Sequence, residues 1–167
     1  MRKYTLLILL LIYSFGGFAQ SIRVASYNIR MNTQSDGENA WDKRKDRVNE
    51  LIKYHDFDIM GTQEGFKGQL DDIGRLKEYA YSGSGRDDGK SAGEHSAIFY
   101  KKDRFKLLKS GDFWFSETPD KPGKGWDARC CNRICSWIKL NDNVTKKEFF
   151  VFNSHFYHEG VVARRNS

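Results

Sequence analysis

The order of helical and strand-like segments is the feature that most constrains the fold of this chain. Alternating apolar residues predict a first strand in IRVASYNIR, and an apolar run predicts a buried strand in FDIMGTQE. Amphipathic spacing predicts helices over 41–54 and 69–79. From residue 96 onward the apolar segments read mostly as strands: SAIFYK, FKLLKSGDFWF, RICSWIKL and KEFFVFNSH. This order predicts a domain that mixes helices and strands.

The composition is that of an ordinary globular protein. Of the 167 residues, 39% are hydrophobic and 14% are aromatic, which is too many for an intrinsically disordered chain. Loops are predicted over 82–93 and 117–126, and no linker separates the segments, so we expect a single domain. The net charge is +6, and +4 once the two basic residues within 1–20 are set aside. An excess this small does not by itself indicate nucleic-acid binding.

The first 20 residues are typical of a signal peptide. Arg2 and Lys3 precede an uncharged apolar run that extends to Phe18 and is shorter than the roughly 20 residues of a membrane-spanning helix. We therefore predict cleavage near residues 19–20, which leaves a secreted or periplasmic segment 21–167 without a membrane span. An uncleaved N-terminal anchor is the alternative.

Polar side chains follow three of the predicted strands at the point where each strand ends. Asn28 ends the first strand, Glu64 the second and His155 the last. Strand ends are rigid yet accessible, so they often carry functional groups. A carboxylate beside an amide oxygen suits Mg²⁺, and a histidine titrates near neutral pH. Each residue also has an ordinary interpretation: a turn residue for Asn28, a helix cap or solvated charge for Glu64, and a partly buried structural histidine for His155.

Two further groups of polar residues allow more than one interpretation. His155-x-x-His158-Glu159 could be read as a zinc site. Two histidines three residues apart fit zinc only with further ligands, however, and the sequence offers no third ligand at convincing spacing. We therefore interpret His158 as lining the same cleft as His155. Arg86 lies in a glycine-rich loop, where it either reaches a substrate or is simply solvated.

Three cysteines leave an odd count for a protein that is expected to be exported. Cys131 and Cys135 would lie roughly 13 Å apart along one strand, beyond the reach of a disulfide. A bond between the adjacent Cys130 and Cys131, or between molecules, would be unusual. We expect Cys135 to be a buried thiol.

Several segments, taken in order, carry a family resemblance. They are SYNIR, GTQE, GEHSAIFYKKDRF, FWFSETP, CNRICSW and NSHFYHEGVVARRNS. Through these segments, which extend over almost all of 22–166, the sequence resembles the endonuclease/exonuclease/phosphatase family, best known from pancreatic-type deoxyribonuclease. The resemblance implies an α+β fold of the four-layer α/β/β/α type, in which helices flank two facing sheets.

The resemblance also implies which residues bind the catalytic metal ion. Asn28 and Glu64 would hold the catalytic divalent cation, which is Mg²⁺ in the first instance and Mn²⁺ or Ca²⁺ as alternatives. Such a cation would offset the negative charge that builds on phosphate oxygens during hydrolysis.

Four more residues match positions that contact the substrate in the family. His155 would contact the phosphate and take part in proton transfer, and Glu94 would pair with it and favour the imidazolium. Arg133 would bind two phosphate oxygens with its planar guanidinium, and Asn153 would add a polar group just before the histidine. A surface salt bridge for Arg133 and an unpartnered loop charge for Glu94 are the alternatives.

The resemblance implies a secreted, metal-dependent hydrolase of phosphate esters, either a phosphodiesterase or endonuclease or a phosphatase. The family's later G-D-x-N stretch and final aspartate–histidine pair do not follow His155, and His55 and His95 occur in other contexts. We therefore expect 21–167 to be the N-terminal part of the domain and incomplete as a catalyst. A non-catalytic remnant or a phosphate-binding module is the alternative. The substrate class stays open among nucleic acids, phospholipid headgroups and small phosphate esters.

Overall fold

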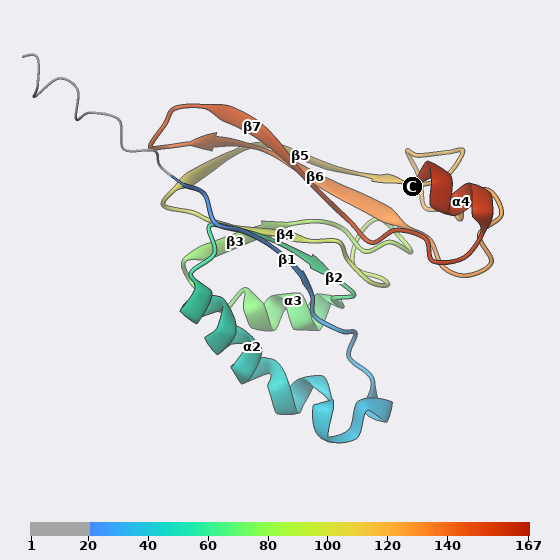
Figure 1. Ribbon diagram of the computed structural model, residues 1–167, viewed down its shortest axis with the longest axis horizontal. Coiled ribbons are helices and arrows are strands. Elements are labelled where there is room, and N and C mark those ends of the chain that lie inside the picture. Colours follow the sequence, from blue (N-terminus) through green and yellow to red (C-terminus); the bar gives the residue numbers. More distant parts are fainter. Residues whose placement is uncertain (1–20) are drawn as a thin grey trace, which may run out of the picture.

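The computed structural model describes residues 21–167, so the predicted signal peptide lies outside the described residues. The elements form three layers (Figure 1): two helices, a four-stranded sheet and a three-stranded sheet. The α+β class is confirmed, and these are three of the four layers expected. Within 21–167 no helix covers the outer face of the three-stranded sheet. Nor does any helix in this range have the length and apolar character needed to cross a bilayer.

The two sheets differ in their topology. The first contains β1 (Val24–Asn28), β2 (Ile59–Gln63), β3 (Tyr79–Ser82) and β4 (Ile98–Lys101), in the spatial order β1-β2-β4-β3. Its β1 and β2 are parallel, and its other pairs are antiparallel. The second is an antiparallel meander of β5 (Phe105–Trp114), β6 (Ile134–Asp142) and β7 (Glu148–Ser154). The helical segments are η1 (Gln34–Asn39), α2 (Trp41–His55), α3 (Lys67–Ile73) and α4 (Val161–Asn166).

The hydrophobic core has two layers because β2 is buried on both faces. Side chains alternate along a strand, so Met60 packs among the residues of α2 and α3, and Ile59 packs toward the second sheet. Ile52, Leu70 and Phe99 complete the first layer around Met60, and Ile98, Ile138 and Leu140 complete the second around Ile59. An apolar run without alternation, as in FDIMGTQE, is what such a doubly covered strand requires.

The predicted helix over 69–79 is only partly correct. The observed α3 ends at Ile73, where the Gly74 N–H still bonds to the Leu70 carbonyl, and the chain then turns into the short strand β3. Tyr79 begins that strand opposite Lys101 of β4. Pairing with β4 therefore outweighs the helical spacing of the apolar residues beyond Gly74. The remaining predicted strands and the helix at 41–54 are confirmed to within a few residues.

The three cysteines are free thiols. Cys135 is buried in β6, as expected, and burial raises the pKa of its thiol to about 11. Cys130 and Cys131 lie in the loop before β6 with their sulfur atoms 2.7 Å apart.

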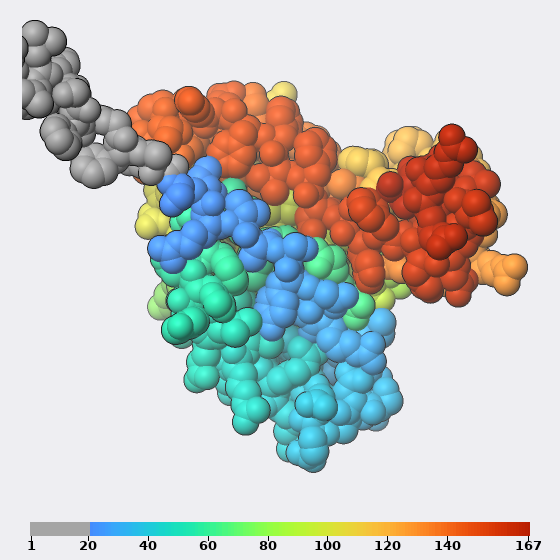
Figure 2. Space-filling view, in the orientation of Figure 1, coloured from blue at the N-terminus to red at the C-terminus, as the bar shows by residue number. Residues whose placement is uncertain are grey.

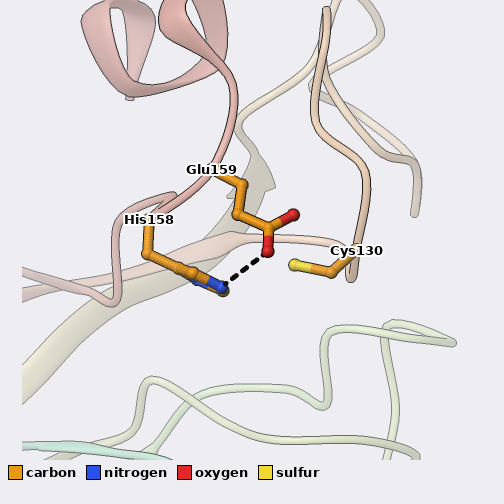
Figure 3. A group of neighbouring side chains, drawn as sticks. All are labelled: Cys130, His158 and Glu159. Atoms are coloured by element: carbon orange, nitrogen blue, oxygen red, sulfur yellow. Dashed lines mark ion pairs between the residues drawn. The ribbon is translucent and has the colours of Figure 1, made fainter.

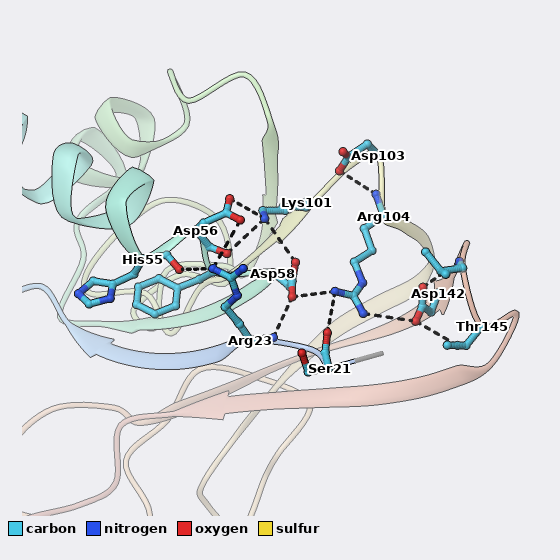
Figure 4. A network of polar contacts seen from close by, with 12 residues as sticks. Ser21, Arg23, His55, Asp56, Asp58, Lys101, Asp103, Arg104, Asp142 and Thr145 are labelled. Carbon is cyan, nitrogen blue, oxygen red and sulfur yellow. Dashed lines mark hydrogen bonds and ion pairs between the residues drawn. The ribbon is translucent and has the colours of Figure 1, made fainter. Parts of the chain in front are cut away.

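A network of charged side chains joins the two sheets where β2 begins (Figure 4). Arg104 donates to Asp58 at 2.8 Å and lies 3.8 Å from Asp142. Lys101 forms ion pairs with Asp56 at 2.7 Å and Asp58 at 3.4 Å. Buried charges are stable only when they are paired, and each carboxylate here faces at least one cation. The network lies at the end of β2 opposite to Glu64.

Candidate active site

Two of the predicted metal ligands lie side by side at the ends of β1 and β2. The parallel register pairs Asn28 with Gln63, which places Glu64 immediately beyond the pair. The Asn28 amide donates to Glu64 Oε1 at 2.8 Å, and the backbone N–H of Met31 donates to Oε2 at 3.2 Å. Glu64 has a φ of 64°, a left-handed conformation that is uncommon for a residue other than glycine and often marks a functional site.

The surroundings of Glu64 keep its carboxylate ionised. Partial burial alone would raise its pKa, but the hydrogen bonds from Asn28 and Met31 and the charges of His155 and Arg30 lower it below the usual value. In this structure the Asn28 amide oxygen accepts from the backbone N–H of Arg30 at 2.9 Å, so it is the amide nitrogen that faces Glu64. An ionised carboxylate and an amide oxygen are nevertheless the hard oxygen donors that Mg²⁺ prefers. The residues present therefore fit the cation that the resemblance implies.

A narrow cavity of about 10 Å³ lies next to this pair, between the ends of the two sheets. Most of the predicted site residues line it, although they come from five separate segments of the chain. The lining residues are Glu64, Arg86, Glu94, His95, Ser96, Arg133, Ile134 and His155. The fold thus brings together five of the eight residues singled out in the sequence and places Asn28 in contact with one of them.

Glu94 pairs with two arginines. The resemblance had implied a pairing with His155, which the structure does not show. Arg86 Nη1 donates to Glu94 Oε2 at 2.7 Å, and Arg133 Nη1 lies 3.9 Å from the same oxygen. Burial raises the pKa of Glu94, while the charges of Arg86 and Arg133 act in the opposite direction. Arg86 is therefore a paired side chain with 14% of its surface exposed and not a solvated loop arginine, because Glu94 holds it against the cavity.

His155 is held in a neutral state, which corrects the expectation that its imidazolium is favoured. Burial and the positive charge of Arg133 lower its pKa, and the opposing effect of Glu64 is smaller. Its Nδ1 atom is buried and has no hydrogen-bond partner. A neutral imidazole with one unpaired nitrogen at the cavity is suited to exchange a proton with a bound group.

Four buried nitrogen atoms of the residues that line this cavity have no hydrogen-bond partner. They are Arg86 Nε, Arg133 Nε, His95 Nε2 and His155 Nδ1. An unpaired buried polar atom typically costs about 1–3 kcal/mol. Within 21–167 the three other side-chain atoms in this condition are spread over other parts of the fold. The two arginine Nε–H groups can only donate, so their concentration at one cavity indicates a binding site for a group with acceptor oxygens, such as an anion.

His95 is a cavity residue that the sequence interpretation did not select. Its Nδ1 lies 3.1 Å from the carbonyl oxygen of Gly65. Because a carbonyl only accepts, Nδ1 carries the proton and Nε2 is left bare. Burial also lowers the pKa of His95. The available signal was its position in GEHSAIF, between Glu94 and a buried strand.

Asn153 ties the two sheets together and does not line the cavity, so the phosphate-binding role expected of it is not supported. Its amide nitrogen donates to the carbonyls of Thr62 at 2.8 Å and Ala97 at 3.0 Å, and its oxygen accepts from Gln63 Nε2 at 2.7 Å. A Cβ on Gly61 would lie 2.7 Å from the Asn153 side chain. Glycine at 61 therefore lets β7 approach β2 closely enough for these hydrogen bonds.

His158 lies beside the cavity and not within it. Arg133 Nη2 donates to His158 Nδ1 at 3.1 Å, while His158 itself lines a second, wider cavity of about 550 Å³. The interpretation of His158 as part of the same cleft as His155 is therefore wrong in detail. Its hydrogen bond with Arg133 nevertheless connects the two cavities.

Comparisons with known proteins agree with this geometry. Residues 25–142 match the endonuclease/exonuclease/phosphatase family. The crystal structure of an endonuclease/exonuclease/phosphatase from Bacteroides vulgatus is 46% identical with a TM-score of 0.84, covering 87% of this chain and 56% of that one. A mannosyl-6-phosphatase from Bacteroides thetaiotaomicron is 50% identical with a TM-score of 0.82, covering 86% and 54%.

A more distant relative shares the same region. An uncharacterized protein of Acanthamoeba polyphaga mimivirus is 30% identical over 137 residues, which cover 75% of this chain and 49% of that protein. The chain thus spans about half the length of the relatives that it matches. On the match over 25–142 and the fold that it shares with these structures, the chain belongs to the endonuclease/exonuclease/phosphatase family.

Proposed function

We propose that residues 21–167 form the cation-binding and phosphoryl-binding part of a divalent-metal-dependent phosphatase. The observation that carries this proposal is the pair of unpaired buried arginine nitrogen atoms, Arg86 Nε and Arg133 Nε, at one cavity beside Glu64. A phosphoryl group supplies several strong acceptor oxygens, which would pair with the arginine nitrogens. Arg86 and Arg133 are both held by Glu94, which leaves further guanidinium N–H groups able to donate to such an anion.

Asn28 and Glu64 would hold the cation. A bound divalent cation would supply Lewis acidity to the phosphate oxygens. Glu64 stays ionised in its surroundings, and the hydrogen bonds from Asn28 and Met31 fix the direction of its carboxylate before any cation arrives. This preorganisation supports a role in catalysis and not merely in helix capping.

Arg133 and His155 would act on the phosphoryl group itself. Arg133 is almost fully buried and held by Glu94 and His158, so its guanidinium has little freedom to turn away from the cavity. His155 is neutral and carries an unpaired Nδ1, which lets it accept a hydrogen bond or a proton from the substrate or water. Glu94 would orient the two arginines and would not orient His155.

A small phosphate monoester is the substrate class that we favour over nucleic acid and lipid. The mannosyl-6-phosphatase from Bacteroides thetaiotaomicron, half of whose aligned residues are identical here, acts on a sugar phosphate according to its name. The modest net charge of +4 over 21–167 also offers little attraction for a nucleic-acid backbone.

We further propose that the protein is exported, on the basis of the sequence of residues 1–20 alone. Cell fractionation together with the N-terminal sequence of the purified protein tests this. Cleavage near residues 19–20 would support export, and an intact Met1 on cytoplasmic protein would contradict it.

The catalytic proposal is tested by release of inorganic phosphate from mannose 6-phosphate, compared with hydrolysis of bis-p-nitrophenyl phosphate as a diester. In a protein that carries the complete domain we expect Mg²⁺-dependent turnover of the monoester, which EDTA abolishes and which Glu64→Gln reduces by about 100-fold or more. Glu78→Gln, at an exposed glutamate before β3, is the matched control and should leave the rate unchanged. Binding of phosphate without turnover would favour the binding-module alternative, and preference for the diester would overturn the substrate class.

A further inference from the structure

A second group of potential metal ligands lies outside the active-site cavity. The sulfur of Cys130, one imidazole nitrogen of His158 and one carboxylate oxygen of Glu159 all lie within 4.8 Å of one another. Figure 3 shows the three side chains converging from two different loops. His158 Nε2 lies 3.6 Å from Glu159 Oε1. The first of these loops supplies the third donor that could not be recognised from the spacing in the sequence.

The fold holds these two loops against each other. Cys130 precedes β6, and His158 and Glu159 follow β7, the neighbouring strand in the second sheet. The carboxylate of Asp127 accepts hydrogen bonds from the first three backbone N–H groups of α4, at 2.8–3.2 Å. In the space-filling view the segment before β6 and the C-terminal segment form one lobe beside the sheets (Figure 2). The convergence of the three side chains therefore follows from fixed backbone contacts.

We propose that Cys130, His158 and Glu159 form a binding site for a zinc-like divalent cation, separate from the magnesium ligands Asn28 and Glu64. Thiolate, imidazole and carboxylate are the three side-chain donors of protein zinc sites, and three of them with one open position is a common arrangement. Zinc bonds of about 2.0–2.3 Å place ligand atoms roughly 3.5 Å apart. The present separations of up to 4.8 Å would close by small rotations of two exposed side chains.

The donor types separate this site from the one beside the phosphoryl cavity. Asn28 and Glu64 offer only oxygen atoms, which suit Mg²⁺. Cys130 adds sulfur, a soft ligand that Mg²⁺ avoids and that zinc and cobalt accept. The two sites are thus expected to select different cations from a mixture.

Binding at His158 would compete with its hydrogen bond to Arg133. Arg133 can only donate, so His158 Nδ1 accepts this hydrogen bond, which leaves the ring proton on Nε2, on the side of Glu159. A cation on Nε2 moves that proton to Nδ1 and ends the acceptance from Arg133. The Cys130 thiol loses its proton to solvent when it becomes the thiolate ligand. One proton is therefore released for each cation bound, and Arg133 is freed from one of its two partners.

The open side of the site faces the wider cavity of about 550 Å³. His158 and Glu159 line this cavity together with Arg129 and Arg164. The carboxylate of Asp127 lines this cavity too, so its charges are mixed. The fourth position of a bound cation would thus be reached by water.

Cys131 provides an internal control. It is adjacent to Cys130 in the sequence but does not belong to the group of donors that lie within 4.8 Å of one another. A disulfide between the two residues would remove the Cys130 thiolate, so binding has to be measured with a phosphine reductant present.

A titration of the protein with Co²⁺ in excess Mg²⁺ tests the proposal, because a thiolate–cobalt bond produces a charge-transfer band in the near ultraviolet. We expect this band to saturate at one Co²⁺ per chain and to disappear when Zn²⁺ is added. Cys130→Ser should remove the band and Cys131→Ser should keep it. Glu159→Gln should weaken binding by at least about tenfold, since the loss of even an outer partner costs 10–100-fold.

Three results would contradict the proposed site. They are the absence of the band in the unaltered protein, a band that persists in Cys130→Ser, and a band that is lost in Cys131→Ser as fully as in Cys130→Ser. Circular dichroism of each variant separates the loss of a ligand from the loss of the fold. None of these readouts depends on phosphatase activity, so the site can fail while the proposed function stands.

Discussion

Two clusters of mostly buried charged side chains, each centred on arginine, lie at opposite ends of β2, and they differ in their surroundings. Arg104 at the first end faces Asp58 and Asp142, and Lys101 adds a second cation to Asp58 (Figure 4). At the other end Arg86 and Arg133 both face Glu94, and Arg86 Nε lies 3.8 Å from the more exposed Asp87. In the first cluster only the Nε atom of Arg104 lacks a hydrogen-bond partner. The second cluster surrounds a cavity, at which the Nε atoms of both arginines lack one.

The contrast shows how the same residue types serve stability in one place and binding in another. A buried arginine with enough carboxylates around it holds segments together. A buried arginine with too few is held in a costly state that an incoming anion relieves. The cost at the second cluster is what we expect phosphate binding to recover.

Replacing Arg104 by methionine should have the largest effect on stability. The change leaves Asp58 and Asp142 buried with fewer partners, and breaking a buried ion pair costs about 3 kcal/mol or more. Urea unfolding followed by circular dichroism measures this loss. The affinity for inorganic phosphate, measured on the folded variant, should be unchanged. A stable Arg104→Met variant would show that the first network is not structural.

Replacing Arg133 by methionine should have the converse effect. We expect the affinity for inorganic phosphate in the presence of Mg²⁺ to fall by about 100-fold, the usual result of losing a preorganised donor to an oxyanion. The free energy of unfolding should be unchanged or higher, because an underpaired buried charge is removed. Isothermal titration calorimetry and urea unfolding give the two values. Equal loss of stability in the two arginine variants would remove the distinction between the clusters.

Asn153→Ala should lower the free energy of unfolding without changing the affinity for phosphate. The change removes three hydrogen bonds between β7 and the first sheet, so we expect a loss of about 2 kcal/mol in the free energy of unfolding. The exposed Asn143 offers a matched control, since its replacement by alanine should cost far less. Phosphate affinity of folded Asn153→Ala should equal that of the unaltered protein. A selective loss of affinity would restore the phosphate-binding role.

The smallest expected effect is the pH dependence that Asp142, in the first cluster, gives to the free energy of unfolding. Although burial alone would raise the pKa of Asp142, hydrogen bonds from Val144 and Thr145 and the charge of Arg104 lower it. Its contribution to stability is therefore complete above the unfolded pKa of about 3.9 and is lost as the pH falls through the lower folded value. The difference in unfolding free energy between the unaltered protein and Asp142→Asn should narrow below about pH 4. A difference that widens on acidification would contradict the assignment.

The sequence predicted the layers and most of the cavity residues, but not how those residues pair. Asn28, Glu64 and His155 were recognisable because each follows an apolar strand. The pairing of Glu94 with Arg86 was not, because it depends on how the loop over 82–93 folds back. Cys130 was missed as a partner of His158 because the two are separated by strands β6 and β7. Spacing along the chain reveals periodic elements, whereas contacts between loops depend on the sheets that carry them.

The most direct test of the central claim is a crystal structure of the protein grown with Mg²⁺ and inorganic phosphate. We predict a cation at Glu64 and Asn28, and a phosphate whose oxygens contact Arg133 and the unpaired Nδ1 of His155. A phosphate bound elsewhere on the surface, with the nitrogens of Arg86, Arg133 and His155 still unpaired, would contradict the account.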